Sequence, residues 1–284
     1  MTRPDRPRGR GQKVSPSPVK RVAEASGIPV YQPERFNTEE TLSRISACGA
    51  DLAIIVAFSA KIGNDALGAF PHGWLNLHPS YLPAYRGAAP MQWALISGET
   101  ETGLTTFFVT EEWDSGQICF QERLAIGPDD TYGELAERCA EIGAGLILKS
   151  VRAIDDGTAP RIDQDDSLAT FAPRIKPEDS VIDWEKSAEA IRNRIRGLSP
   201  KPGAYSVFSG RRLYIQETRV LQELDEPSQG RPGEVVRAGK QGLVVTTGEG
   251  FLDLLSVQPE NKSAMSGKAF VNGYRVKAGD QFGV

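Results

Sequence analysis

Along the first half of the chain, segments whose apolar residues recur at helical spacing alternate with segments whose apolar residues recur at strand spacing. Apolar stripes between capping residues and glycines predict four helices, at 17–27, 37–49, 90–98 and 131–157, with Asn37 and Glu40, then Thr131 and Glu134, as capping boxes. Strands are predicted at 51–58, 74–78, 104–110 and 117–126, and the first is continuously apolar, which is typical of a buried parallel strand. Strands separated by helices predict an α/β layer with a mostly parallel sheet.

After Gly157 the pattern changes to polar residues and prolines, followed by one short helix carrying Ile191, Ile195 and Leu198. Short strand-like pieces between glycines come next, namely RRLYIQETRVL, GEVVRAG, GLVVTTG and GFLDLLSVQ. Their spacing predicts a small antiparallel barrel. The sequence thus predicts an α/β domain over 1–169, a linker over 170–186 and a β-barrel domain over 187–284.

The composition is that of an ordinary globular protein, with 39% apolar and 25% charged residues. No run of eighteen apolar residues occurs, and the basic start MTRPDRPRGRGQ has no apolar segment behind it. We therefore expect a cytoplasmic protein without a membrane span or a secretory signal. The three cysteines have no C-x-x-C spacing, so neither a zinc site nor a disulfide framework is indicated.

The formal net charge of -4 is unevenly distributed along the chain. Residues 1–21 hold seven Lys or Arg against Asp5, and residues 187–284 hold fourteen basic against ten acidic residues. The ends therefore carry net charges of +6 and +4, which leaves -14 for the middle. Basic ends and an acidic middle are the pattern expected if the two ends bind a polyanion. A solvated basic tail would give the same pattern.

Asn76 and His78 occupy alternate positions of the predicted strand 74–78, directly before a proline-rich loop. Alternate residues of a strand share a face, and the carboxyl end of a parallel strand is where open α/β sheets place ligand sites. An amide can donate to a developing oxyanion, and an imidazole with a pKa of about 6.5 can accept a proton near neutrality. The same pair could instead fix the following loop through backbone hydrogen bonds, and these residues alone leave both interpretations open.

The motifs around this strand resemble the formyltransferases that use 10-formyltetrahydrofolate, most closely the members that formylate methionyl-tRNA. The central motifs are NLHPSYLP, AYRGAAPMQWA, GETETG and TEEWDSGQI. RPDRPRGRGQKVSPSPVK resembles the family's basic loop, APRIKPEDSVIDW its interdomain linker, and GFLDLLSVQPENKSAMSGKAFVNGYR its C-terminal signature. The resemblance covers nearly the whole chain and implies a Rossmann-like catalytic domain followed by an OB-like barrel.

The resemblance assigns catalysis to Asn76, His78 and Asp114. Asn76 would polarise the formyl carbonyl and hold the oxyanion, and His78 would assist deprotonation of the attacking amine and stabilise the same charge. Asp114 would orient His78 and manage the proton returned to the folate nitrogen. Without the family, Asp114 in W-D-S-G could be an ordinary turn residue. No metal is required. The folate pocket is expected to contain Phe58, Ser59, Ala60, Lys61, Ile62, Leu82 and Pro83, whereas Ser80 and Arg86 are expected to stabilise the loop after His78.

The implied acceptor is initiator methionyl-tRNA, and formylation of it would support translation initiation. The basic loop at 2–16 is expected to reach the acceptor stem through Arg8, Arg10 and Lys13. Arg192 and Arg196 lie one helical turn apart and are further candidates for tRNA phosphates, as are Arg211, Arg212, Lys262 and Lys268. A monomer is expected.

The chain also departs from the family pattern. It begins at the basic loop, so we expect the first strand and helix of the family to be missing, with neighbouring strand edges exposed. This departure keeps open a non-catalytic tRNA- or folate-binding remnant. A sister activity on a sugar-nucleotide or purine-precursor amine is a further alternative, which the basic loop and the terminal barrel argue against.

Overall fold

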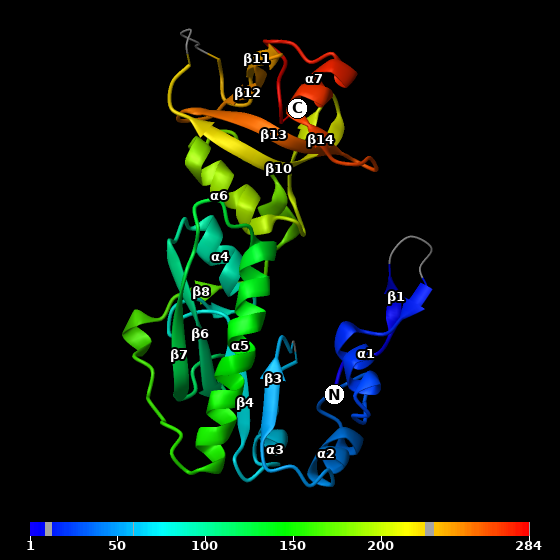
Figure 1. Cartoon of the computed structure of the whole chain (residues 1–284), viewed down its shortest axis with the longest axis vertical. Helices are drawn as coiled ribbons and strands as arrows, with labels where there is room; N and C mark the ends of the chain where they lie inside the picture. Colours follow the sequence, from blue (N-terminus) through cyan, green and yellow to red (C-terminus); the bar gives the residue numbers. More distant parts are fainter. Residues whose placement is uncertain (9–12, 59, 225–229, 284) are drawn as a thin grey trace. The chain divides into compact units, whose positions relative to one another are not determined.

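The computed structural model describes residues 1–8, 13–58, 60–224 and 230–283 (Figure 1). By internal contacts the chain forms two compact units. The first consists of Met1–Asn76 with Phe108–Trp113, and the second of Leu77–Phe107 with Asp114–Val284. In the described parts of the chain, none of the helices combines the length and the apolar character needed to cross a bilayer.

The first unit is built around a small aromatic core. Its elements are β1 (Arg6–Arg8), β2 (Lys13–Ser15), α1 (Pro18–Ala25), α2 (Glu39–Ser46), β3 (Ala53–Val56), α3 (Asn64–Leu67) and the start of β4 (Trp74–His78). Phe36 and Phe70 contact Trp74 edge to face, with ring centroids 5.9 and 5.1 Å apart. The basic start is an antiparallel β1–β2 hairpin, which the sequence pattern did not predict.

Two of the predicted helix starts can be compared with the caps in this unit. Ser17 caps α1, as predicted, because its Oγ accepts from the Lys20 amide. The capping box at Asn37 is wrong, because Thr38 caps α2 instead. The Asn37 side chain is used elsewhere, accepting from the Gly63 amide and donating to the Lys61 carbonyl.

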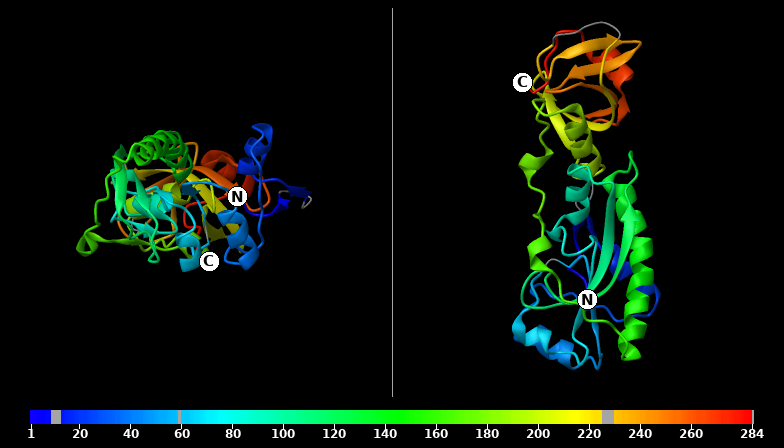
Figure 2. Two further views of the ribbon diagram at one scale, coloured as in Figure 1. Left: turned by 90° about the horizontal axis from the view of Figure 1, so that it is seen from below. Right: turned by 90° about the vertical axis from the view of Figure 1, so that its left-hand side faces the viewer.

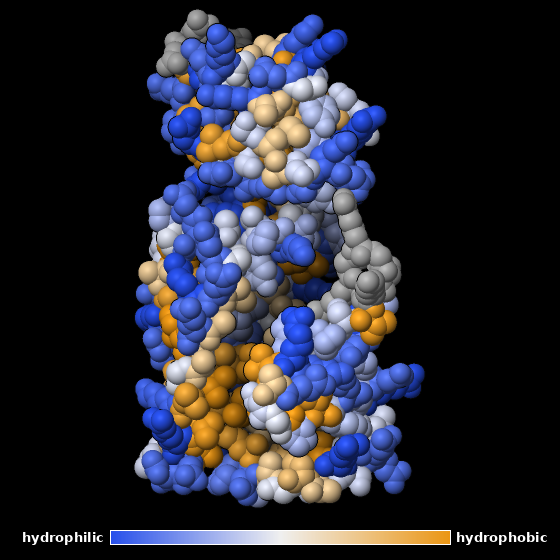
Figure 3. Space-filling view, turned by 45° about the vertical axis from the view of Figure 1, so that its right-hand side comes forward, coloured by the Kyte–Doolittle hydropathy of each residue, from blue (hydrophilic) through white to orange (hydrophobic). Residues whose placement is uncertain are grey.

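Strand β3 is less buried than its apolar sequence predicts. Ile54 and Val56 are 46% and 54% exposed, and burial alternates along the strand. Because β3 stands at the end of the strand order β3-β4-β6-β7, it has no described strand on its other side. Apolar side chains gather in a hollowed part of the surface in Figure 3, and Ile54 and Val56 line a cavity of about 430 Å³ within the first unit.

The second unit begins with the α/β layer. It contains the end of β4, then β5 (Arg86–Gly87), α4 (Pro90–Ile96), β6 (Glu101–Phe108), β7 (Ile118–Ala125) and α5 (Tyr132–Asp155). Strands β6 and β7 are antiparallel, so the sheet is mixed, since the connection between them is too short for a parallel crossover. The predicted capping box of α5 is confirmed, with reciprocal bonds between Thr131 and Glu134. Helix α5 runs along β6 and β7 (Figure 2).

The chain then continues into the C-terminal domain. Before this domain come η1 (Asp166–Leu168) and β8 (Phe171–Ala172), and β8 pairs with β5 of the α/β layer. The linker and the domain then contain η2 (Pro177–Ser180), α6 (Ala188–Leu198), β9 (Ala204–Phe208), β10 (Arg211–Leu221), β11 (Val235–Gly239), β12 (Gly242–Thr246), β13 (Phe251–Pro259), β14 (Met265–Ser266) and α7 (Gly267–Tyr274). The sheet is antiparallel, in the order β11-β12-β13-β10-β9. The C-terminal tail bridges its two ends through Phe282 with Phe208 and Gln281 with Glu234, which closes the predicted barrel. The sequence pattern did not predict β9 and α7.

Helix α6 connects the barrel to the α/β layer by packing against α4. At Gly197 an added Cβ would lie 2.8 Å from Ile96 Cγ1 and 3.0 Å from the Gln92 carbonyl oxygen. The two helices can therefore approach this closely only because position 197 has no side chain. Gly145, on α5, has open space at the corresponding position.

We predict that Gly197→Ala lowers the free energy of unfolding by about 1–3 kcal/mol, because the added methyl overpacks the α4–α6 contact. Gly145→Ala is the matched control and should raise it by about 0.5–1 kcal/mol, since alanine favours a helix over glycine. Chemical denaturation followed by circular dichroism measures both changes. Equal effects of the two substitutions would contradict the close packing of α6 on α4.

Candidate active site

Strand β4 delivers the two polar side chains that the sequence singled out. Asn76 is half-buried, and His78, the last residue of the strand, is only 4% exposed. Leu77, between them on the opposite face, packs in the core under α5, where Gly143 leaves room for its side chain. The apolar residues thus fix the strand, and the alternation turns Asn76 and His78 to its other face.

The His78 imidazole lies between a backbone carbonyl and a carboxylate. Its Nε2 is 2.9 Å from the carbonyl oxygen of Tyr85, and its Nδ1 is 3.8 Å from Oδ2 of Asp114. A carbonyl oxygen can only accept, so Nε2 carries the proton in the neutral ring. Nδ1 is then left with a free lone pair beside the Asp114 carboxylate, and it can accept a proton.

Burial lowers the pKa of His78 below its ordinary value of 6.5. The negative charge of Asp114 and the Tyr85 carbonyl both act in the opposite direction, but burial is the larger effect. The ring is therefore neutral at pH 7. A neutral imidazole next to a carboxylate can take up a proton, and the carboxylate stabilises the cation that forms.

Asp114 lies in the loop between β6 and β7, in the turn that the sequence left open as either structural or catalytic. The residue is 8% exposed, and its φ is +52°, a left-handed conformation that aspartate tolerates in turns. Oδ2 accepts a hydrogen bond from the Gly87 amide at 2.8 Å. The turn therefore places a buried carboxylate directly in front of His78.

The loop after His78 holds both groups through its backbone. It provides the Tyr85 carbonyl for His78 and the Gly87 amide for Asp114. Ser80 closes the loop by donating to the Ala84 carbonyl, and Thr105 of β6 accepts from the Leu82 amide. The expected role of Ser80 in this loop agrees with these bonds.

Arg86 is buried in the same loop, and its hydrogen-bond partners include residues that the sequence analysis missed. Its guanidinium donates to Gln164 Oε1 at 2.7 Å and to Asp166 Oδ1 at 2.7 Å. Gln164 in turn donates to the carbonyl oxygens of Asp114 and Gly116. Gln164 belongs to a polar stretch, RIDQDDSLAT, which has neither periodicity nor a motif, so nothing in the sequence marked it.

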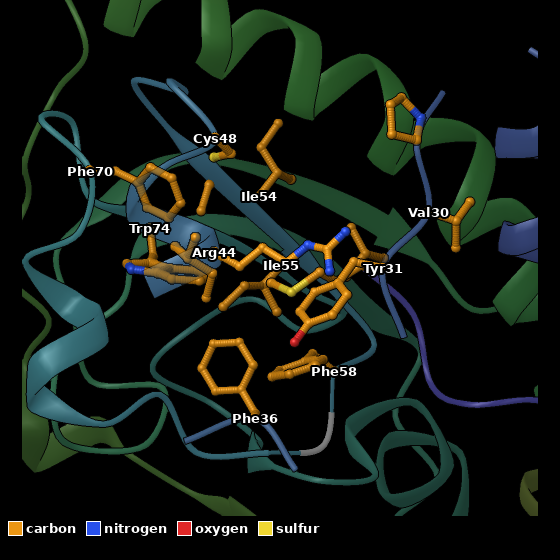
Figure 4. A pocket seen from close by; sticks show the side chains of 15 residues that line it. Val30, Tyr31, Phe36, Arg44, Cys48, Ile54, Ile55, Phe58, Phe70 and Trp74 are labelled. Carbon is orange, nitrogen blue, oxygen red and sulfur yellow. The ribbon is translucent and has the colours of Figure 1, made fainter. Parts of the chain in front are cut away.

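Four of the expected folate-pocket residues lie in the first unit, and Ser59 lies outside the described residues. Ile62 is buried in the aromatic core, and Lys61 is exposed. Phe58 lines the 430 Å³ cavity together with Phe36, Tyr31 and Arg44, whose guanidinium lies 4.4 Å above the Tyr31 ring (Figure 4). Among the described folate candidates, Ala60, Lys61, Ile62, Leu82 and Pro83 do not line this cavity, which is mostly apolar.

The remaining two folate candidates belong to the second unit. Leu82 is fully buried and Pro83 is half-buried, and the backbone of both positions takes part in loop hydrogen bonds. The Leu82 side chain is therefore packed in the protein interior beneath the loop. The Leu82 amide and carbonyl are engaged by Thr105 and Gln121, so the half-buried Pro83 ring is the more accessible of the two candidates.

The basic residues predicted to contact tRNA have different surroundings. Arg8 and Lys13 pair with each other across the β1–β2 hairpin, and Arg10 lies outside the described residues. Arg192 on α6 is engaged by Asp129 at 2.6 Å and by Glu189 at 3.0 Å.

Arg196, the other tRNA candidate on α6, is a buried residue. Its Nε donates to Asn193 Oδ1 at 2.8 Å, and its Nη1 faces the carbonyl oxygens of Gly127 and Asp130. Burial lowers the pKa of its guanidinium, and the charge of Arg192 acts in the same direction. Helical spacing correctly placed the two arginines on one side of α6, but that side faces the α/β layer.

The geometry predicts how His78 titrates. The chain has only two histidines, so NMR of the imidazole groups resolves both, and His72→Gln assigns them. We expect His78 to titrate below pH 6.5 and, in Asp114→Asn, at a still lower pH, because the substitution removes the charge that favours the imidazolium. Asparagine keeps an acceptor oxygen for Gly87. An unchanged His78 pKa in this variant would contradict the electrostatic pairing.

Among the residues that the structure describes, no group of three or more His, Cys, Asp or Glu side chains could hold a metal ion. The candidate site contains the paired imidazole of His78 and carboxylate of Asp114. Such a pair can manage the proton of an attacking amine during acyl transfer.

Comparison with known proteins agrees with this chemistry. The Formyl transferase family model matches residues 1–151, and the model of the formyl transferase C-terminal domain matches residues 174–275. The methionyl-tRNA formyltransferase of Moorella thermoacetica is 45% identical over 283 residues, covering 100% of this chain and 90% of its own length. That of Symbiobacterium thermophilum is 43% identical, covering 99% and 86%.

Solved structures share the fold at lower identity. The N-formyltransferase of Helicobacter canadensis, solved with folinic acid and dTDP-3-aminofucose, has a TM-score of 0.63 and 18% identity, covering 89% of this chain and 85% of its own. The methionyl-tRNA formyltransferase of Clostridium thermocellum has a TM-score of 0.55 and 20% identity, covering 70% and 86%. With its site geometry, both family models and these relatives in agreement, the chain belongs to the formyl transferase family.

Proposed function

We propose that this protein transfers the formyl group of 10-formyltetrahydrofolate to the amino group of initiator methionyl-tRNA, and so acts in translation initiation in the cytoplasm. The observation that carries the proposal is the buried His78 and Asp114 pair, in a chain that is similar over its full length to methionyl-tRNA formyltransferases. Family membership alone would leave the acceptor open. The full-length similarity to relatives named for methionyl-tRNA favours that acceptor over an amino sugar.

In the proposed reaction the methionyl amine attacks the formyl carbon, and the carbonyl oxygen becomes negatively charged. Asn76, two residues before His78 on β4, donates from its amide to this oxygen. His78 accepts through Nδ1 the proton that the amine loses, and Asp114 stabilises the imidazolium. The imidazolium then returns the proton to the folate nitrogen as the C–N bond breaks. The proton that moves from the amine to the folate nitrogen is thus carried by His78 in this scheme.

The proposed donor contacts in the first unit are Phe58, Ser59, Ala60, Lys61 and Ile62, and those in the second unit are Leu82 and Pro83. Phe58 is half-buried and aromatic, which suits contact with a pterin ring. Lys61 is exposed, and its charge could meet the acidic part of a folate. The Lys61 carbonyl is already occupied by Asn37, so the backbone of this segment is held in place by the protein itself.

The acceptor is proposed to contact the two basic ends of the chain. The hairpin of β1 and β2 carries Arg8 and Lys13, and Arg10 lies between them in sequence. In the barrel, Arg211, Arg212 and Lys262 line a cavity of about 560 Å³ with the aromatic rings of Phe208 and Tyr274. Cationic side chains provide affinity for phosphates without reading sequence.

The test of the proposal is formyl transfer to methionyl-tRNA, with an amino sugar nucleotide as the competing acceptor. We expect transfer to the tRNA, and a decrease in kcat of about 10²–10⁴-fold in His78→Ala, because the proton acceptor is lost. The control is His72→Ala, which removes the other histidine, an exposed residue, and should leave kcat unchanged. Transfer to the amino sugar alone would refute the acceptor, and full activity of His78→Ala would refute its catalytic role.

The basic hairpin makes a separate prediction about tRNA affinity. We expect Arg8→Ala with Arg10→Ala to weaken tRNA binding and to reduce the slope of log K against log salt by about 1–2, because fewer counterions are released. The matched control is Arg152→Ala at the exposed end of α5. Binding is measured by filter retention between low and moderate salt. A slope equal to that of the parent would exclude phosphate contacts by these two arginines.

A further inference from the structure

Gln164 contacts both loops that form the candidate active site. It lies in residues 162–172, here called the return segment, which run from the end of α5 back along the α/β layer. Its Oε1 accepts from Arg86 Nε at 3.1 Å and from Nη2 at 2.7 Å. Its Nε2 donates to the carbonyl oxygens of Asp114 at 2.9 Å and Gly116 at 2.8 Å. One side chain thus joins the loop after His78 to the turn that carries Asp114.

The amide group is suited to this position because it both accepts and donates. Arg86 has only donors, and the two backbone carbonyls only accept, so an amide satisfies both sides at once. A glutamate could accept from Arg86 but would place a carboxylate oxygen against the two carbonyl oxygens. A hydrophobic residue would leave the buried Arg86 without this acceptor.

The return segment is held in place by other bonds, independently of Gln164. Ile162 pairs with Ile118 of β7 through two backbone hydrogen bonds, of 2.8 and 3.0 Å. At its other end β8 pairs in parallel with β5, and the Thr170 side chain accepts from the Tyr85 amide at 2.8 Å. Gln164 is therefore presented from a fixed backbone to two loops that carry the reacting groups.

The contact with Asp114 acts on its backbone, where the conformation is unusual. Asp114 has a φ of +52°, and its Oδ2 also accepts from Gly87. Gln164 fixes the carbonyl of this left-handed residue, while Gly87 fixes its carboxylate. Without the Gln164 bonds, the hydrogen-bond donor to the carboxylate among the described residues would still be the Gly87 amide, but the backbone that carries the carboxylate would be less fixed, so its position in front of His78 would become less well defined.

We propose that Gln164 is a positioning residue for formyl transfer, which holds the Asp114 carboxylate against His78 by tying the turn at 114–116 to Arg86. The turnover part of this inference rests on the proposed function; the effect on the His78 and Asp114 pair does not. The described hydrogen bonds of Gln164 go to Arg86 and to the backbone carbonyls of Asp114 and Gly116, and none goes to a side chain of that pair. It acts on them through backbone and through the neighbouring loop.

The kinetic test compares Gln164→Ala and Gln164→Glu with the parent in formyl transfer. We expect kcat to decrease by about tenfold to a hundredfold in both variants, because the proton acceptor and its carboxylate partner are misplaced. KM for either substrate should stay within about threefold, since Gln164 lies outside the proposed substrate contacts. Glutamate keeps the acceptor for Arg86, so Gln164→Glu isolates the loss of the two donors and replaces Gln164→Ala if the latter fails to fold.

Gln117→Ala is the matched control. Gln117 Nε2 donates to Asp163 Oδ1 at 2.8 Å, so this variant removes a glutamine bond between the same two segments without touching Asp114. We expect its kcat to match that of the parent within about twofold. Equal losses in Gln117→Ala and Gln164→Ala would show that only the docking of the return segment matters, and would overturn the specific role of Gln164.

The titration of His78 provides a readout that is independent of turnover. In Gln164→Ala the pKa of His78 should fall below its value in the parent, as it should in Asp114→Asn, because the carboxylate that favours the imidazolium moves away. NMR of the two histidines measures this in the absence of substrates. An unchanged His78 pKa would overturn the proposal. A parent without formyl transfer would refute the proposed function and leave this test intact.

Discussion

The site depends on the burial of one imidazole against one carboxylate. Removing either group from water is unfavourable unless each finds a partner, and here the partners are largely backbone groups of a single loop. Tyr85 accepts from His78, and Gly87 donates to Asp114. Because both contacts come from adjacent stretches of the same loop, the distance between the two reacting groups follows from the conformation of that loop.

That loop is in turn fixed by segments far away in the sequence. Thr105 of β6 accepts from the Leu82 amide, Gln121 of β7 donates to the Leu82 carbonyl, and Thr170 of the return segment accepts from the Tyr85 amide. At Gly87 an added Cβ would lie 2.6 Å from the Ala172 carbonyl oxygen, and the φ of +124° also requires glycine. The amide that orients Asp114 therefore depends on close approach between two backbones.

The return segment also connects the loops of the candidate active site to the rest of the chain, because the linker and the barrel follow it directly in sequence. Close packing of α6 on α4 at Gly197, and the engagement of Arg192 by Asp129, hold the start of the barrel domain against the α/β layer. Part of the positive charge that the sequence analysis assigned to tRNA phosphates therefore forms contacts between the barrel domain and the α/β layer. In the barrel, Arg211, Arg212 and Lys262 lie around a cavity beside β10 and the β13–β14 turn.

The sequence by itself determined helices α1, α2, α4, α5 and α6, strands β3, β4, β6, β7 and β10 to β13, and the polar pair on β4. These features are local, because caps, glycines and the spacing of apolar residues depend on a few neighbouring positions. Asp114 was found through the family motif, since its turn residues alone have an ordinary explanation. The tertiary structure alone decided that Asp114 faces His78, that Gln164 joins their loops, and that Arg196 is buried. Each of these depends on segments tens of residues apart, whose approach is governed by packing and backbone hydrogen bonds that no local pattern encodes.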